Sequence, residues 1–196
     1  MIEADAATTL CVMVVAYLLG SISNAVLVCH FMGIGDPRQL GSGNPGATNV
    51  LRTGNRAAAL LTLTGDISKG MLAVSIAQWL ELTLFDQALV GICALIGHVW
   101  SIFLRFRGGK GVATMLGCCL FLDYRLALFQ IAVWLLLLAI RRISSLAAVG
   151  MALMSPAFCW LVIPELLLPL IIMSSLILAT HHQNIRKLLN CQENPL

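Results

Sequence analysis

A glycine-rich segment at residues 41–52, with the sequence GSGNPGATNVLR, has the composition of a phosphate-binding loop. Glycine tolerates positive φ angles and leaves backbone N–H groups uncovered, so several in succession can form a concave site for an anion. Polar side chains in the segment add hydrogen-bond donors, and one arginine adds positive charge. The candidate binding residues are Gly41, Ser42, Gly43, Asn44, Gly46, Thr48, Asn49 and Arg52. The alternative is that the segment is a flexible polar connector.

A second segment, residues 105–114, also combines glycines with basic side chains and then begins an apolar run. It is not a Walker A loop, because Leu104 stands where the first glycine belongs and Gly111 follows the lysine. A helix that begins after Gly108, Gly109 and Lys110 would still offer free N–H groups and a favourable dipole to a phosphate. The alternative is that these basic residues only hold the chain's orientation against anionic lipid.

Two further polar pairs stand out. His181 and Asn184 are three residues apart, so they share a face if the last apolar helix continues through them; alone, this segment is typical of an interfacial amphipathic tail. Asp66 and Lys69 have the same spacing inside an apolar run, where ionisable residues are costly and therefore functional candidates. We expect Asp66 and Lys69 to pair with each other or with a loop, in a supporting role that holds the first glycine-rich segment in place.

The cysteines and histidines do not form a metal-binding pattern. The seven cysteines contain no CxxC pair, and six of them lie in apolar runs. The four histidines form no HExxH motif and no cluster with cysteine. We therefore expect no disulfide, no metal and no cofactor.

The composition predicts the kind of protein that must position these residues. Hydrophobic residues make up 59% of the 196 residues, charged residues only 11%, and the mean hydropathy is +0.92. A soluble domain needs far more polar cover, so the chain is predicted to be an all-α integral membrane protein. About seven apolar runs are candidate transmembrane helices, at residues 8–30, 55–80, 84–104, 111–122, 126–140, 143–163 and 166–180. With short loops and no internal repeat, residues 1–196 are expected to form a single domain.

The basic residues orient this bundle. With the N-terminus outside and the C-terminus in the cytoplasm, ten of the twelve lysines and arginines lie in inner segments, as the positive-inside rule requires. The first run follows Glu3 and Asp5, so it is not expected to be a removable signal peptide. Three runs are short, which leaves open six spans or a re-entrant fourth segment. Both glycine-rich segments, His181 and Asn184 then face the cytoplasm.

Four sequence blocks resemble one family, the bacterial acyl-phosphate:glycerol-3-phosphate acyltransferases of the small multi-span membrane type. The blocks are GSI at 20–22, GSGNPGATNVLR at 41–52 with DISKG at 66–70, GH at 97–98 with GGKGVAT at 108–114, and His181 with Asn184 and Ile185. Together they extend over nearly the whole chain. Two departures concern prolines that are usual in the family and are absent here, at Ser23 and within residues 99–102.

The resemblance implies a reaction and roles for residues. A fatty acyl group would pass from acyl phosphate to the sn-1 hydroxyl of glycerol 3-phosphate, giving lysophosphatidic acid and phosphate in the first acylation of phospholipid biosynthesis. Ser42, Lys110 and His181 would be catalytic. The acyl phosphate would bind at Ser42, Asn44, Thr48 and the backbone of 41–46, whereas Arg52, Lys110, His181 and Asn184 would hold glycerol 3-phosphate. Asn49, Gly108 and Gly109 complete the expected substrate-binding set, and the proton acceptor stays open between His181, Ser42 and a substrate phosphate.

The expected setting is the bacterial cytoplasmic (inner) membrane, with membrane lipid as a partner and no nucleic acid. A soluble enzyme that makes acyl phosphate is a candidate partner on the inner face. Three alternative functions compete with this expectation. An acyl-CoA-dependent enzyme lacks support, because none of the four histidines belongs to an HxxxxD motif. A transporter of a phosphorylated solute would account for Asp66 and Lys69, although no repeat in two halves supports it. A pure scaffold leaves the polar inner segments unexplained.

Overall fold

The computed structural model describes residues 6–195, and every regular element in that range is helical. The α-helices are α1 Ala6–Ser21, α2 Asn24–Phe31, α3 Ala47–Leu51, α4 Arg56–Trp79, α5 Leu84–Val99, α6 Val112–Leu122, α7 Tyr124–Arg141, α8 Ser144–Val162, α9 Leu167–Thr180 and α10 His182–Leu189. Short 3-10 turns lie at Pro37–Gln39, Ile102–Leu104 and Pro164–Leu166. The predicted all-α class is confirmed for the described residues.

Each predicted apolar run corresponds to a helix or to a pair of helices. Within residues 6–195, five segments are long and apolar enough to cross a membrane: Ala6–Phe31, Arg56–Trp79, Leu84–Leu104, Tyr124–Arg141 and Ser144–Val162. A sixth is present if Pro164–Thr180 and His182–Leu189 form one span bent by 65°, while Val112–Leu122 is shorter. The predicted shortness of the fourth run is confirmed by α6, which has 11 residues. Seven spans and their orientation stay predictions. Glu3 and Asp5, on which the signal-peptide expectation rests, lie outside the described residues.

The first span is broken where polar residues interrupt it. Helix α1 ends at Ser21, and α2 begins at Asn24 after the N-cap Ser23, whose hydroxyl accepts a hydrogen bond from the Val26 N–H at 3.4 Å. A serine at an N-cap satisfies an N–H group that the new helix would otherwise leave unpaired. The break leaves the carbonyl of Ile22 available, and Lys69 on α4 donates a hydrogen bond to it.

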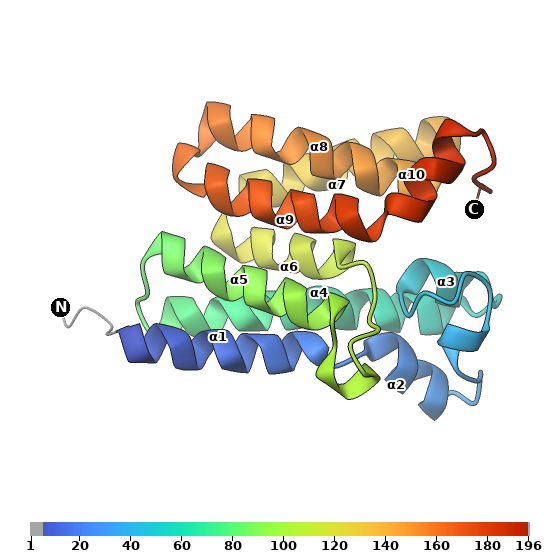
Figure 1. Ribbon diagram of the computed structural model, residues 1–196, viewed down its shortest axis with the longest axis horizontal. Coiled ribbons are helices and arrows are strands. Elements are labelled where there is room, and N and C mark those ends of the chain that lie inside the picture. The colour runs from blue at the N-terminus through green and yellow to red at the C-terminus, as the bar shows by residue number, and fades with distance from the viewer. Residues whose placement is uncertain (1–5, 196) are drawn as a thin grey trace.

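Small residues bring the central helices into close contact. A side chain at Gly20 on α1 would clash with the Ala94 carbonyl on α5, and one at Gly97 would clash with the Tyr17 carbonyl. Gly117 on α6 is equally close to the Ile67 carbonyl on α4. Such positions let helices in lipid gain packing that apolar burial alone does not provide there. As a result, α5 packs on α1 and α6 packs on α4, as Figure 1 shows.

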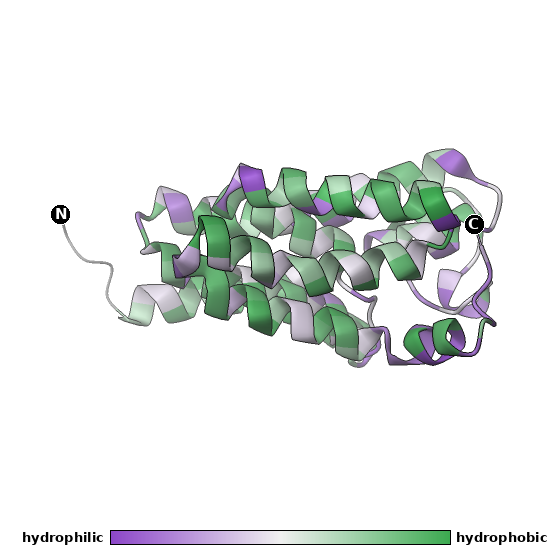
Figure 2. Ribbon diagram, turned by 90° about the horizontal axis from the view of Figure 1, so that it is seen from above, coloured by the Kyte–Doolittle hydropathy of each residue, from purple (hydrophilic) through white to green (hydrophobic). Residues whose placement is uncertain are grey.

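The polar segments gather at one end of the bundle. In Figure 1, α2, α3, α10 and the C-terminus lie at one end of the long axis, and the N-terminal end of α1 lies at the other. Figure 2 shows a mostly hydrophobic helical body with hydrophilic connections at its ends. The helices also expose large apolar side chains such as Leu61, Leu136 and Leu161, which is the surface expected of a protein in lipid. The arrangement therefore brings both glycine-rich segments and the end of the chain to the same end of the bundle.

Candidate active site

A cavity of about 320 Å³ lies where the glycine-rich loop, the start of α6 and the end of the chain meet. Its polar end is lined by Ser42, Asn44, Thr48, Arg52, Lys110, His181 and Asn184. From there it continues between α4, α6, α7 and α8, where apolar side chains such as Ile67, Leu116, Ile131 and Met151 line it. One continuous space thus joins a polar, cationic end to an apolar end.

The apolar part opens at the side of the bundle. Leu63 on α4 and Leu135 on α7 both line the cavity and are also 39% and 53% exposed on the protein surface. Helix α6 packs against both α4 and α7 and forms the wall behind this opening. An apolar chain can therefore enter from the surrounding lipid without passing through water.

The glycine-rich loop is held by one buried amide, Asn49 on α3, which is 1% exposed. Its Nδ2 group donates to the carbonyls of Pro37, at 2.7 Å, and Leu40, at 3.0 Å. Its Oδ1 atom accepts from the Ser42 N–H at 2.8 Å and from the Ser42 hydroxyl at 3.1 Å. Asn49 touches the cavity, but its side chain is fully occupied by the loop, so the contacts shown here are structural. The Ser42 hydroxyl must leave Asn49 before it can donate to a substrate.

The glycines differ in what they contact. Gly41 has a φ of 55° and lies so close to Asn49 Oδ1 that a side chain would clash there, and Gly43 has a φ of 72°. Gly108 and Gly109 donate their N–H groups to the carbonyls of Val99, at 2.9 Å, and His98, at 3.0 Å. None of these four glycines lines the cavity, whereas Gly46 does. They shape the loops from behind, by letting the backbone turn or approach a neighbour.

Lys110 is the central cation of the polar end. Its Nζ donates to Asn184 Oδ1, and its own carbonyl accepts from the Thr180 hydroxyl at 3.1 Å. Burial lowers the pKa of the Lys110 ammonium; the Glu193 carboxylate opposes this shift, and positive Arg52 and Lys187 add to it. A phosphate bound here would favour the charged form of Lys110 and replace the water that burial has removed.

Glu193 brings a carboxylate into this cationic end. Its Oε1 atom accepts hydrogen bonds from Asn184 Nδ2, at 2.6 Å, and from the Ser145 hydroxyl, at 2.8 Å. Glu193 lines the same cavity as Lys110 and Arg52. An anionic group therefore already uses donors that a substrate phosphate would need.

His181 lies at a sharp bend of the chain. Helix α9 ends at Thr180 and α10 begins at His182, with 65° between them, so the condition that the last helix continues straight through His181 is not met. His181 Nδ1 is 2.8 Å from the Ile177 carbonyl, which only accepts hydrogen bonds, so Nδ1 carries the proton. In the neutral ring, Nε2 is then an acceptor. The bend still leaves His181 and Asn184 on the same cavity.

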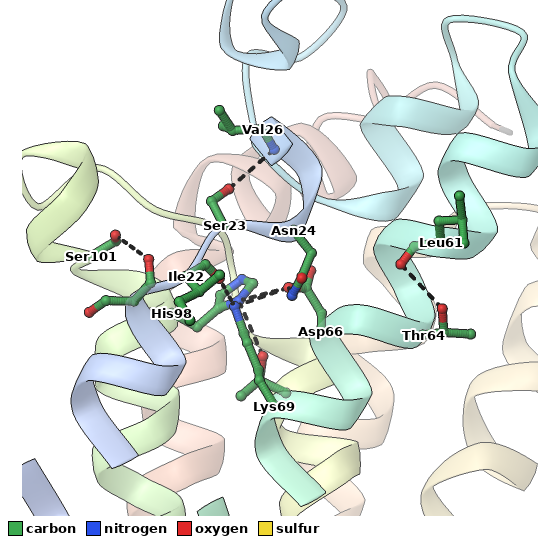
Figure 3. A network of polar contacts seen from close by, with 12 residues as sticks. Ile22, Ser23, Asn24, Val26, Leu61, Thr64, Asp66, Lys69, His98 and Ser101 are labelled. Atoms are coloured by element: carbon green, nitrogen blue, oxygen red, sulfur yellow. Dashed lines mark hydrogen bonds and ion pairs between the residues drawn. The ribbon is translucent and has the colours of Figure 1, made fainter. Parts of the chain in front are cut away.

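Behind the cavity lies a buried polar cluster around Asp66 (Figure 3). The expected pairing is confirmed, since Lys69 Nζ is 3.0 Å from Asp66 Oδ1. The same Nζ donates to the Ile22 carbonyl at 2.7 Å, and Asn24 Nδ2 donates to Asp66 at 3.0 Å. The pair therefore holds the break between α1 and α2 rather than the glycine-rich loop. Asp66 lines the cavity and Lys69 does not.

His98 joins this cluster to the start of α6. Its Nδ1 atom is 3.7 Å from Asp66 Oδ1 and 3.1 Å from the Thr114 hydroxyl, and the residue lines the cavity. A side chain at Gly109 would clash with the His98 ring, so the glycine makes room for it. The helix that carries Lys110 at its start is thereby fixed against α5 and α4.

Sequence reasoning left several cavity residues out of the site: His98, Gln130, Ser145 and Glu193. Gln130 had a usable signal, because a polar amide inside an apolar run needs a partner. His98 had one in the GH block. Glu193 had no comparable signal, because its position depends on how the chain turns back after α10 ends at Leu189. Within residues 6–195, no group of three or more histidine, cysteine or acidic side chains is placed to hold a metal ion.

The fold and the cavity define a helical membrane protein in which a cationic, donor-rich site opens into an apolar chamber. Residues 10–191 match the family described as "Glycerol-3-phosphate acyltransferase". A glycerol-3-phosphate acyltransferase from Laribacter hongkongensis is 50% identical over 192 residues, covering 95% of this chain and 96% of the relative. The chain belongs to the glycerol-3-phosphate acyltransferase family and is an acyltransferase.

Solved structures agree with this membership. The chain is similar to the crystal structure of PlsY (YgiH), an integral membrane glycerol 3-phosphate acyltransferase, in its glycerol 3-phosphate form. The TM-score is 0.90 at 32% identity, and the match covers 96% of each chain. The lysophosphatidic acid form of that protein matches with a TM-score of 0.89 at 31% identity. The predicted family, enzyme class and integral-membrane fold are confirmed.

Proposed function

We propose that the protein transfers a fatty acyl group from acyl phosphate to the sn-1 hydroxyl of glycerol 3-phosphate, releasing lysophosphatidic acid and phosphate. The observation that carries this proposal is the single cavity, whose cationic end suits phosphate and whose apolar end suits an acyl chain. The names of the matched relatives and the two ligand forms of the solved neighbour support the acceptor and the product. An enzyme of this kind would begin phospholipid synthesis.

Acyl phosphate is a mixed anhydride and is already activated, so the protein has mainly to position two reactants and to neutralise charge. Lys110, Arg52, His181 and Asn184 bind glycerol 3-phosphate in this proposal. Ser42, Asn44 and Thr48, with the backbone of the loop, bind the acyl phosphate. The attacking hydroxyl adds to the acyl carbon, the bond to the phosphate oxygen breaks, and phosphate leaves with its electron pair.

The hydroxyl proton must pass to a base within hydrogen-bond reach. His181 Nε2 is available, because Nδ1 is engaged by the Ile177 carbonyl. The leaving phosphate is a second acceptor for the same proton. The groups described here provide for direct transfer, without a covalent acyl-enzyme intermediate.

In this proposal the site faces the cytoplasm at the bacterial inner membrane, and the basic residues of its loops support that orientation through the positive-inside rule. Acyl phosphate would then come from a soluble enzyme on that side, and the lateral opening would admit its acyl chain. The product keeps one acyl chain and returns to the same leaflet.

The test is an assay of the purified protein with glycerol 3-phosphate and either palmitoyl phosphate or palmitoyl-CoA, with lysophosphatidic acid as the readout. Product from palmitoyl phosphate alone is the expected result. Product from palmitoyl-CoA alone would overturn the donor and leave the acceptor in place. Product from neither, with counterflow of labelled glycerol 3-phosphate in proteoliposomes, would favour transport of a phosphorylated solute instead.

A further inference from the structure

The deep end of the cavity holds one polar residue that the proposed reaction does not use, Gln130 on α7. It is fully buried and lines the cavity among apolar neighbours such as Ile131 and Met151. Of the α7 residues that line the cavity, Gln130 lies farthest from the inner end of the helix at Arg141. It therefore stands at the end of the apolar chamber, remote from the phosphate-binding groups.

The amide of Gln130 is held firmly on one side only. Its Nε2 group donates to the Ser155 hydroxyl at 3.2 Å and to Cys119 Sγ at 3.4 Å. Ser155 in turn donates to the Met151 carbonyl at 2.8 Å, which fixes its lone pair toward Gln130. The Oε1 atom of Gln130 is buried and has no hydrogen-bond partner among the described residues. The hydrogen bonds keep the amide in place, so it cannot move aside without losing them.

Two hydrogen bonds to α8 show how far Gln130 lies from the glycine-rich loop along the helix. At the polar end, the Thr48 hydroxyl lies 3.2 Å from the Ser144 hydroxyl, and at the deep end Gln130 bonds Ser155. Ser144 and Ser155 are both on α8, and the rise between positions 144 and 155 is about 16 Å at ~1.5 Å per residue. Half of a hydrocarbon core of ~30 Å is about the same length. Gln130 thus lies about as far from the glycine-rich loop as one membrane leaflet is deep.

We propose that Gln130 is the floor of the acyl-chain chamber and limits the length of chain that the enzyme accepts. The proposal rests on the proposed acyl donor. A chain that ends above Gln130 fills the chamber with apolar contacts. A longer chain must push its methyl end against a fixed amide with an unpartnered oxygen, or bend out through the lateral opening. Gln130 is a specificity-determining residue in this view and takes no part in the chemistry.

The test compares kcat/KM for lauroyl, palmitoyl and stearoyl phosphate in the wild type, Gln130→Ala and Gln130→Phe. Gln130→Ala is expected to raise the stearoyl-to-palmitoyl ratio roughly tenfold, the factor that two additional buried methylenes contribute. Gln130→Phe is expected to lower palmitoyl relative to lauroyl, because the larger ring shortens the chamber. A ratio within one preparation does not depend on how much of the variant is folded.

The matched control is Gln78→Ala. Gln78 also lies in a membrane helix and donates its amide to a carbonyl, that of Phe121 at 2.6 Å, but it does not line the cavity. Its ratios should equal those of the wild type. Unchanged ratios in both Gln130 variants, with activity retained, would overturn the role of Gln130 alone. Absence of product from every acyl phosphate in the wild type would overturn the proposed donor and this inference with it.

Discussion

Replacement of Lys110 by methionine removes the central positive charge of the polar end and keeps most of the side-chain volume. In the free protein, Lys110 donates to Asn184 and lies in a cavity that Arg52 also lines. A hydrogen bond to a charged group contributes about 1.5–3 kcal/mol, and the upper value applies where water is largely excluded. A loss of ~3 kcal/mol corresponds to roughly a hundredfold in kcat/KM.

The assay is the initial rate of lysophosphatidic acid formation with glycerol 3-phosphate varied at saturating palmitoyl phosphate. Lys187→Met is the matched control, since Lys187 adds positive charge near Lys110 without lining the cavity. It should change kcat/KM by less than about threefold, as exposed charges usually do. A Lys110→Met variant that retains its thermal midpoint and stays within threefold of the wild type would refute the reasoning. Equal losses in both variants would show that only the overall charge matters.

Three further predictions follow from the same contacts. Burial lowers the pKa of Lys110, so its ammonium loses a proton as the pH rises through that lowered value. The kcat/KM for glycerol 3-phosphate should therefore fall at alkaline pH. In a pH–rate profile, Lys110→Arg should move this fall to higher pH. Asn49→Ala leaves the buried partners of its amide unsatisfied, and should cost about 2–4 kcal/mol and lower the thermal midpoint of the detergent-solubilised protein; an unchanged midpoint would contradict the holding role of Asn49. Glu193→Gln removes the negative charge of a carboxylate that accepts a hydrogen bond from Asn184, and it should lower the KM for glycerol 3-phosphate about threefold in steady-state kinetics. A higher KM would show that Glu193 aids binding.

Much of the fold follows from the apolar runs, because lipid requires each crossing segment to satisfy its own backbone as a helix. The spacing of Asp66 and Lys69 predicted their ion pair for the same reason, since residues three apart on a helix share a face. Lys110 comes from a different segment than the pair His181 and Asn184, and both segments were expected to meet at one membrane surface. They do line one cavity.

The sequence does not predict features of the site that depend on which way a loop folds. A glycine-rich pattern does not reveal whether the missing side chain faces a ligand or a neighbouring helix, and Gly108 and Gly109 face α5. Asn49 has the chemistry of a ligand donor but turns inward to the loop carbonyls. The bend at His181 occurs without a proline or glycine, so no local signal marks it. Glu193 reaches Asn184 because the chain turns back after α10, where Cys191 has a φ of 54° and the Gln192 N–H donates to the Lys187 carbonyl.

In the proposed reaction, entry of the acyl donor through the lateral opening between Leu63 and Leu135 would also decide which concentration of the donor governs the enzyme's rate. A reactant that enters from lipid is diluted by other lipids and not by water. Occupancy of the chamber would therefore depend on the mole fraction of the proposed donor in the membrane, whereas binding of glycerol 3-phosphate would depend on its concentration in solution. The enzyme would thus work as a two-phase catalyst, with one reactant counted per unit area and the other per unit volume. Adding inert lipid at fixed total donor should slow it.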